Sequence, residues 1–111
     1  SEKELMESEI KRKFDDSVGI TGNWRKPGPY YYIPLSCLTG VKNKNLITAG
    51  RCISADTAWD ITRVIPTCAV TGQAAGTAAA IAAKELAGDL SKIDIVKLRK
   101  RLKQNKVVLD L

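Results

Sequence analysis

The sequence contains no histidine and has few of the other residues that build compact catalytic or metal sites. Its 111 residues include three cysteines, one methionine and one phenylalanine. Without histidine the chain cannot form a Ser-His-Asp triad, a Cys-His pair or a histidine-containing zinc site. Three cysteines without tight pairing in the sequence also do not make the disulfide framework of a small secreted protein. We therefore expect free thiols and no metal site.

Aromatic residues are scarce, so the core must be built mainly from small side chains. They make up 5% of the sequence, whereas hydrophobic residues reach 44%, largely through alanine. A chain of this length forms one small domain and buries about two-thirds of the surface that it exposes when unfolded. Because 27% of the residues are charged and apolar residues recur periodically, the composition predicts a folded chain.

The net charge of +6 comes mainly from one region near the C-terminus. Residues 97–106 contain six lysines and arginines and no acid, with Leu98 and Leu102 at helical spacing. This pattern is typical of the solvated face of an amphipathic helix, and a nucleic-acid-binding face is the alternative. Because no recognised nucleic-acid-binding motif accompanies the basic residues, we expect no nucleic-acid partner.

No segment predicts a membrane span. Residues 64–83 are uncharged, but they consist mostly of alanine, glycine and threonine instead of the large apolar residues that favour insertion. The first residues are charged and do not resemble a signal peptide, and free thiols are typical of reducing compartments. We therefore expect a cytoplasmic protein.

The first half of the chain predicts one helix and two short strands. Apolar residues at helical spacing indicate a helix over residues 5–14, supported by Glu and Lys four residues apart. Glycine and proline then predict a loop, before residues 30–33 form a strand that ends at Pro34. Residues 46–49 form an apolar run that ends at Gly50, as is typical of a buried strand.

The second half predicts two helices. Residues 66–87 form a long helix that begins with a proline and stops at Gly88. Ser91 or Asp94 then caps a shorter amphipathic helix. Residues 107–109 add an edge strand.

The long helix carries an unusually flat side. Gly72, Gly76 and Ala80 lie four residues apart, and each glycine costs about 1 kcal/mol relative to alanine inside a helix. Close contact with a sheet, a second helix or a cofactor would offset this cost. If the contact is with a cofactor, the unpaired amides at the start of the helix and Arg63 just before it favour a negatively charged group. The residues alone leave both interpretations open.

Several motifs follow one another along the chain. They read NLITAGRCISAD at residues 45–56, RVIPTC at 63–68 and TGQAAGTAAA at 71–80. FDDSVG at residues 14–19 and WRKPGP at 24–29 precede them. In this order they resemble the C-terminal end of FAD-dependent oxidoreductases. The resemblance is to the broad glutathione-reductase-like flavoprotein group, which includes the succinate dehydrogenase and fumarate reductase flavoprotein subunits.

The resemblance implies a fold class and a division of the chain. We expect an α+β fragment with few short strands, a long Ala/Gly-rich helix and flanking amphipathic helices, forming the C-terminal part of a FAD-binding α/β domain. Residues 1–111 would be a single C-terminal fragment. Residues 1–44 would hold the first helix and a Pro/Gly/Tyr-rich connection, residues 45–88 the FAD-domain strand and helix, and residues 89–111 the basic helix and tail.

The resemblance also implies which residues face the cofactor. In the family, the end of the strand passes the ribityl and pyrophosphate region, and the following helix begins beside the pyrimidine edge of the isoalloxazine ring. The implied FAD contacts are Gly50, Arg51, Val64, Ile65, Pro66, Thr67 and Cys68. Arg63 is the candidate catalytic residue, because an arginine in the equivalent loop acts on substrate in some relatives. Trp24 and Trp59 are expected to be packing residues, and Trp59 is the better candidate for a substrate-pocket wall.

Two features depart from the family pattern. The position after the strand glycine is often acidic, but here it is Arg51. The chain also lacks the G-x-G-x-x-G spacing, between a strand and a helix, that binds the ADP half of FAD. We therefore expect this chain alone to be inactive and to bind no FAD tightly.

Two hypotheses about function follow. The first is that the chain is part of a FAD-dependent oxidoreductase, supplies the isoalloxazine-facing wall of its flavin site and has the remainder of the parent flavoprotein as its partner. The second is a stand-alone module that dimerises through the flat helix. We expect a homodimer of the isolated chain, because its apolar strand edge and flat helix would lack partners. Cys52 and Cys68 are expected to be buried packing residues, with a redox pair as the alternative.

Overall fold

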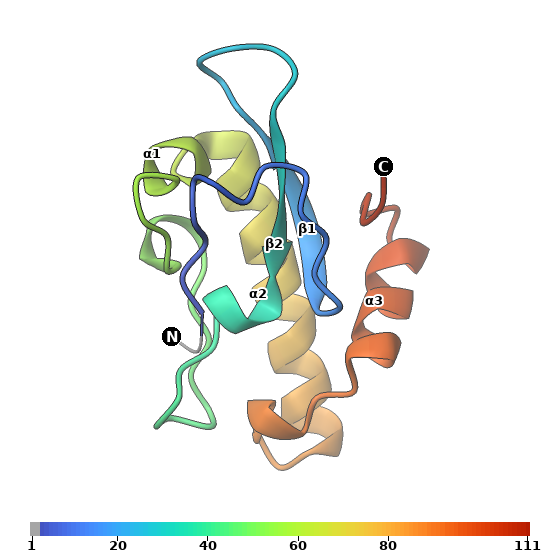
Figure 1. Ribbon diagram of the computed structural model, residues 1–111. Coiled ribbons are helices and arrows are strands. Elements are labelled where there is room, and N and C mark those ends of the chain that lie inside the picture. The colour runs from blue at the N-terminus through green and yellow to red at the C-terminus, as the bar shows by residue number, and fades with distance from the viewer. Residues whose placement is uncertain (1–2) are drawn as a thin grey trace.

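A computed structural model describes residues 3–111 and shows a β-hairpin lying on a long helix, with a shorter helix beside it (Figure 1). The strands are β1 (Ser17–Gly22) and β2 (Tyr30–Pro34), which pair antiparallel. The helices are α1 (Trp59–Thr62), α2 (Ile65–Glu85) and α3 (Ile95–Gln104), with short 3-10 turns η1 (Leu35–Cys37), η2 (Gly50–Cys52) and η3 (Leu90–Lys92). β1 contacts both α2 and α3. The expected mixture of α and β structure is confirmed.

The hairpin contains one predicted strand and one that the sequence did not indicate. The tyrosine strand is confirmed as β2, and it ends at Pro34, which has no N–H to continue a ladder. The sequence predicts a loop where β1 forms, because Gly19 and Gly22 weaken the strand signal. Glycine is needed at Gly19 for another reason: a Cβ there would lie 2.3 Å from Cγ1 of Val70 on α2. The missing side chain therefore lets β1 approach α2 closely.

The long helix is confirmed as α2 to within two residues at its C-terminal end. Val64 is its extended N-cap residue, and Ala87 and Gly88 turn the chain out of the helix with φ of 53° and 82°. The predicted alanine packing is also confirmed. The buried residues of α2 are Thr67, Thr71, Ala74, Ala75, Ala78 and Ala82.

The flat glycine side of α2 makes no close contact among the described residues. Gly72, Gly76 and Ala80 are exposed, and a Cβ added at either glycine would meet no atom within 4 Å. The expectation that close packing offsets the cost of these glycines is therefore wrong for residues 3–111. The alanines that do pack lie on a different side of the helix.

The amphipathic helix is confirmed as α3. Asp94 is the cap, and its carboxylate accepts hydrogen bonds from the amides of Val96 and Lys97 at 3.0 and 3.4 Å. Ser91 lies earlier, in η3, where Asp89 provides the cap. Leu98 and Leu102 are fully buried against the core. Their helical spacing therefore identifies the inner face correctly.

The predicted helix over residues 5–14 is wrong. Leu5 is fully buried, but it lies in an extended segment and forms a parallel bridge with Ala55. Lys11 adopts a positive φ of 59°, which a helix does not contain. Glu9 is buried and binds Lys3 at 3.0 Å and Arg12 at 3.1 Å, instead of a lysine four residues later. Pairing with a distant segment and this ion cluster replace the local helix.

Two predicted strands are also wrong. Over residues 46–49, only Ile47 takes part in a bridge, to Thr39, and Leu46 is 51% exposed. Residues 107–109 follow α3 as irregular chain, in which only Leu109 is buried. Both runs are apolar enough for a strand. A strand also needs a neighbouring strand with which it pairs over several residues. Residues 3–111 provide no such strand beside either run.

The core joins the hairpin, η1, α2 and α3. Its largest fully buried side chains include Tyr31, Ile33, Ile61, Leu98 and Leu102, and the alanines of α2 fill the space between them. Among the helices of residues 3–111, none has both the length and the apolar character needed to cross a membrane. The core thus consists of a few large side chains packed on the alanines of α2, as the scarcity of aromatic residues implied.

The contact of Gly19 with Val70 gives a test of the hairpin position. Gly19→Ala should lower the free energy of unfolding by about 1–3 kcal/mol, because the β-branched Val70 has little rotamer freedom in a helix. In the double variant with Val70→Ala the loss should be smaller than the sum of the single losses. Urea unfolding measures both. Gly22→Ala, which meets no atom within 4 Å, is the control and should change stability by less than about 0.5 kcal/mol.

The buried thiol of Cys37 gives a second test. Burial raises the pKa of Cys37 to about 12, so the thiol stays protonated at pH values where an unfolded cysteine, with a pKa of about 8.5, ionises. At about pH 8.5, iodoacetamide should modify the exposed Cys52 and leave Cys37 unmodified until urea unfolds the chain. Peptide mass spectrometry distinguishes the sites. Equal rates at the two thiols in the folded chain would show that Cys37 is not in the core.

Candidate functional site

The two segments predicted to face a cofactor lie together at the start of α2. The amide of Gly50 donates a hydrogen bond of 2.8 Å to the hydroxyl of Thr71, one turn into the helix from Thr67. Gly50 has a positive φ of 63°, and a Cβ there would lie 3.6 Å from the sulfur of Cys68, an ordinary contact. Backbone conformation, and not lack of space, therefore favours glycine at this position. η2 is thereby held against the first turns of α2.

The first turn of α2 is fixed on its inner side and open on its outer side. The hydroxyls of Thr67 and Thr21 are buried and share a hydrogen bond of 2.7 Å, which joins the helix to β1. The amide of Cys68 donates to the carbonyl of Val64, while Ile65 is 85% exposed. Since the first amides of a helix lack partners within it, the open side presents N–H groups and the positive end of the helix dipole.

Two arginines lie close to the ring of one tryptophan beside this turn. The guanidinium carbons of Arg51 and Arg63 lie 5.8 and 5.5 Å from the centre of the Trp59 ring. The Trp59 indole also donates a hydrogen bond of 3.2 Å to the carbonyl of Arg51. The two distances between the guanidinium carbons and the ring centre are within the range of cation–π attraction. We call these three side chains the Arg51–Trp59–Arg63 cluster.

Asp60 holds the second arginine of the cluster. Its carboxylate binds Nε of Arg63 at 2.9 Å and lies 3.9 Å from Nη1 of Arg25 in the hairpin loop. The indole of Trp24, in the same loop, donates to the Asp60 carbonyl at 2.9 Å. These side chains are partly exposed, so the ion pairs position groups more than they stabilise the fold. The contact sets the direction of Arg63 and ties the loop to α1.

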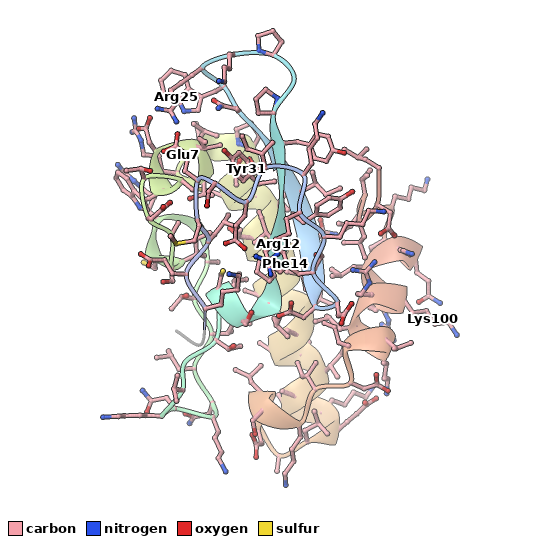
Figure 2. All side chains as sticks on the ribbon, in the orientation of Figure 1. Glu7, Arg12, Phe14, Arg25, Tyr31 and Lys100 are labelled. Atoms are coloured by element: carbon pink, nitrogen blue, oxygen red, sulfur yellow. The ribbon has the colours of Figure 1, made fainter. Side chains whose placement is uncertain are left out.

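Glu7 extends this network to the N-terminal segment. It binds Nη2 of Arg25 at 3.0 Å, and its carbonyl accepts a hydrogen bond of 2.9 Å from the hydroxyl of Tyr31. Figure 2 shows Arg25, Glu7 and Tyr31 at the same end of the molecule, near the hairpin loop. The sequence predictions missed both acids: they place Glu7 in a helix, whereas its partner Arg25 is 18 residues away, and they do not include the pairing of Asp60 with Arg63 three residues later.

The cysteines are placed differently from one another. Cys52 is exposed, so the expectation that it is a buried packing residue is wrong. Cys68 is partly buried and its thiol donates to the carbonyl of Arg63 at 3.4 Å. All three cysteines are free thiols. The described residues also contain no group of three or more His, Cys, Asp and Glu side chains placed to hold a metal ion.

An open groove of about 720 Å³ lies next to η2. It is lined mainly by the connection between η1 and η2, including Val41 and Leu46, and it reaches Cys52 in η2 and Ile53 just after it. None of the predicted cofactor contacts lines it. The candidate site is therefore the surface formed by η2, α1 and the first turn of α2, and not this groove.

The comparisons with known proteins agree with the motifs gathered at this site. Residues 1–102 match the family model described as FAD dependent oxidoreductase. Neither the curated proteins nor the solved structures give a significant match. Since the match covers most of the 111 residues, the chain belongs to the FAD dependent oxidoreductase family.

Proposed function

We propose that this chain supplies the isoalloxazine-facing wall of the flavin site in a FAD-dependent oxidoreductase of the glutathione-reductase-like group, related to the succinate dehydrogenase and fumarate reductase flavoproteins. One observation carries the proposal. The guanidinium carbons of Arg51 and Arg63 both lie close to the Trp59 ring, 5.8 and 5.5 Å from its centre, next to the open first turn of α2. This combination offers positive charge, N–H donors and a flat apolar ring on one surface.

The donors at this surface fit one edge of a flavin ring. The polar edge of the ring presents oxygen and nitrogen atoms, which amides and guanidinium groups can bind, and an indole suits the flat part of a ring system. The proposed contacts are Gly50, Arg51, Val64, Ile65, Pro66, Thr67 and Cys68. FAD, when bound, supplies the electron- and hydride-transfer chemistry.

The same residues do not fit the ADP half of FAD. That half needs a glycine-rich turn between a parallel strand and a helix. Residues 3–111 contain a single antiparallel strand pair, and the sequence has no G-x-G-x-x-G spacing. We therefore propose that other residues of the oxidoreductase bind the phosphates, and that the chain alone is inactive and holds FAD weakly.

Each group in the cluster has a distinct part in this proposal. Arg63, directed by Asp60, stabilises negative charge that develops at the open turn of α2. Arg51 adds a second cation where relatives often carry an acid, so it favours a more anionic ligand than a carboxylate would. Trp59, which lies close to both cations, forms the apolar wall.

Replacing Arg63 tests the proposal in the FAD-loaded oxidoreductase. Arg63→Ala should reduce kcat/KM, with a loss of transition-state stabilisation of about 2–4 kcal/mol, or shift the flavin potential. Arg101→Ala is the control, because Arg101 is exposed on α3 and has no ion pair among the described residues. If both the kinetics and the potential of the Arg63 variant match those of the unchanged enzyme, Arg63 is not part of the site.

A second candidate function is dimerisation through α2. Gly72, Gly76 and Ala80 form an exposed, smooth side of the helix with no neighbour at either glycine. Small residues four apart allow two helix backbones to approach closely. A second copy of the chain would then gain the contacts that offset the helix-breaking tendency of the glycines.

Sedimentation equilibrium of the isolated chain at micromolar concentrations tests this alternative. We expect a dimer, and Gly76→Arg should convert it to monomer because a long charged side chain separates the two helices. Gly22→Arg is the matched control, since Gly22 is also exposed with no atom near its Cβ position. A strictly monomeric 12.1 kDa chain would contradict the dimer.

A further inference from the structure

α3 is fixed to the molecule by one face and leaves the other face free. Leu98 and Leu102 are fully buried in the core, and Asp94 caps the first turn. Because its apolar side is already occupied, α3 cannot insert this side into a lipid bilayer as amphipathic membrane helices do. Its outer face is therefore a surface of fixed shape.

A groove of about 560 Å³ runs along this outer face. It is lined by Asp15, Ile95, Val96, Arg99, Lys100, Lys103 and Gln104. Val96 is 72% exposed, although valine is strongly apolar. The groove thus combines an uncovered apolar side chain with the long stems of three cations, which also present apolar surface below their charges.

Lys100 is the groove cation that has no acidic partner among the described residues. Arg99 and Lys103 both bind the carboxylate of Asp110, at 3.2 and 3.1 Å. Lys97, on a neighbouring side of the helix, binds Glu85. Figure 2 shows the Lys100 side chain projecting from α3 away from the rest of the molecule. Residues 97–106 carry six cations and no acid, so an excess of positive charge remains around the groove.

We propose that this groove binds an acidic protein segment that inserts an apolar side chain beside Val96 and pairs a carboxylate with Lys100. Interfaces of this kind place an apolar anchor in the centre and charge pairs at the rim. A single-stranded nucleic acid is a poorer fit, because no aromatic side chain lines the groove to stack on a base. The inference uses α3 and the residues beside it and does not depend on the proposed flavin site.

The test is fluorescence-anisotropy titration of the full chain with a labelled helical peptide composed of Glu and Leu. The peptide should bind, and rising salt should weaken binding. Lys100→Glu and Val96→Ser should each weaken binding by about tenfold, through charge reversal and loss of the apolar contact. The same peptide with Ser at each Leu should bind at least about tenfold more weakly.

Matched variants separate the groove from general charge and exposure effects. Lys26→Glu makes the same charge change at an exposed lysine in the hairpin loop, and Val41→Ser removes a valine that is also 72% exposed. Both should bind the peptide as the unchanged chain does. The proposal is overturned if Lys26→Glu weakens binding as much as Lys100→Glu, if the Ser peptide binds equally well, or if single-stranded DNA or anionic vesicles bind more tightly than the peptide. Circular dichroism establishes that each variant is folded.

Discussion

The contact between β1 and α2 determines where the candidate site lies. Gly19 allows the strand backbone to approach the helix, and the buried hydrogen bond between Thr21 and Thr67 fixes the first turn of α2. One turn later, the Thr71 hydroxyl accepts a hydrogen bond from the amide of Gly50 and so holds η2 against the helix. A buried hydroxyl without its partner costs about 1–3 kcal/mol, so these threonines define one arrangement of the three elements. The Arg51–Trp59–Arg63 cluster forms next to them, where η2 contacts α1 and α2.

The small residues of α2 explain how so few aromatic side chains form a core. Ala74, Ala78 and Ala82 are buried on α2, which contacts β1 and α3. Alanine contributes little apolar area, but it allows larger neighbours such as Tyr31 and Leu98 to pack close to the helix backbone. Close packing of large neighbours onto the helix backbone therefore compensates for the small size of the alanine side chains. The exposed glycine side of the same helix has no such neighbour in residues 3–111, which is why it is a candidate contact surface.

The charged side chains serve different purposes at the two ends of the molecule. Around α1, Glu7 and Asp60 both approach Arg25 of the hairpin loop, and Asp60 also holds Arg63 just before α2. On α3, Asp110 neutralises two cations and leaves Lys100 unpaired among the described residues. Partly exposed ion pairs add little to stability, so their main effect is the direction in which the remaining cations point. This direction is what a ligand or partner would meet.

The sequence alone predicted β2, α2 and α3, because each has local signals for its start, its end or its buried side. It also predicted, from motif resemblance, that Gly50 and Cys68 belong to one region, and the structure brings them together.

Tertiary structure decided the rest. Residues 5–14 have a helical pattern, but pairing between Leu5 and Ala55 outweighs it. β1 forms despite its glycines, because β2 and α2 supply the partners that a short strand needs. The approach of Arg51 and Arg63 to the Trp59 ring likewise depends on how η2, α1 and α2 pack, since no periodicity relates residues in these separate short elements.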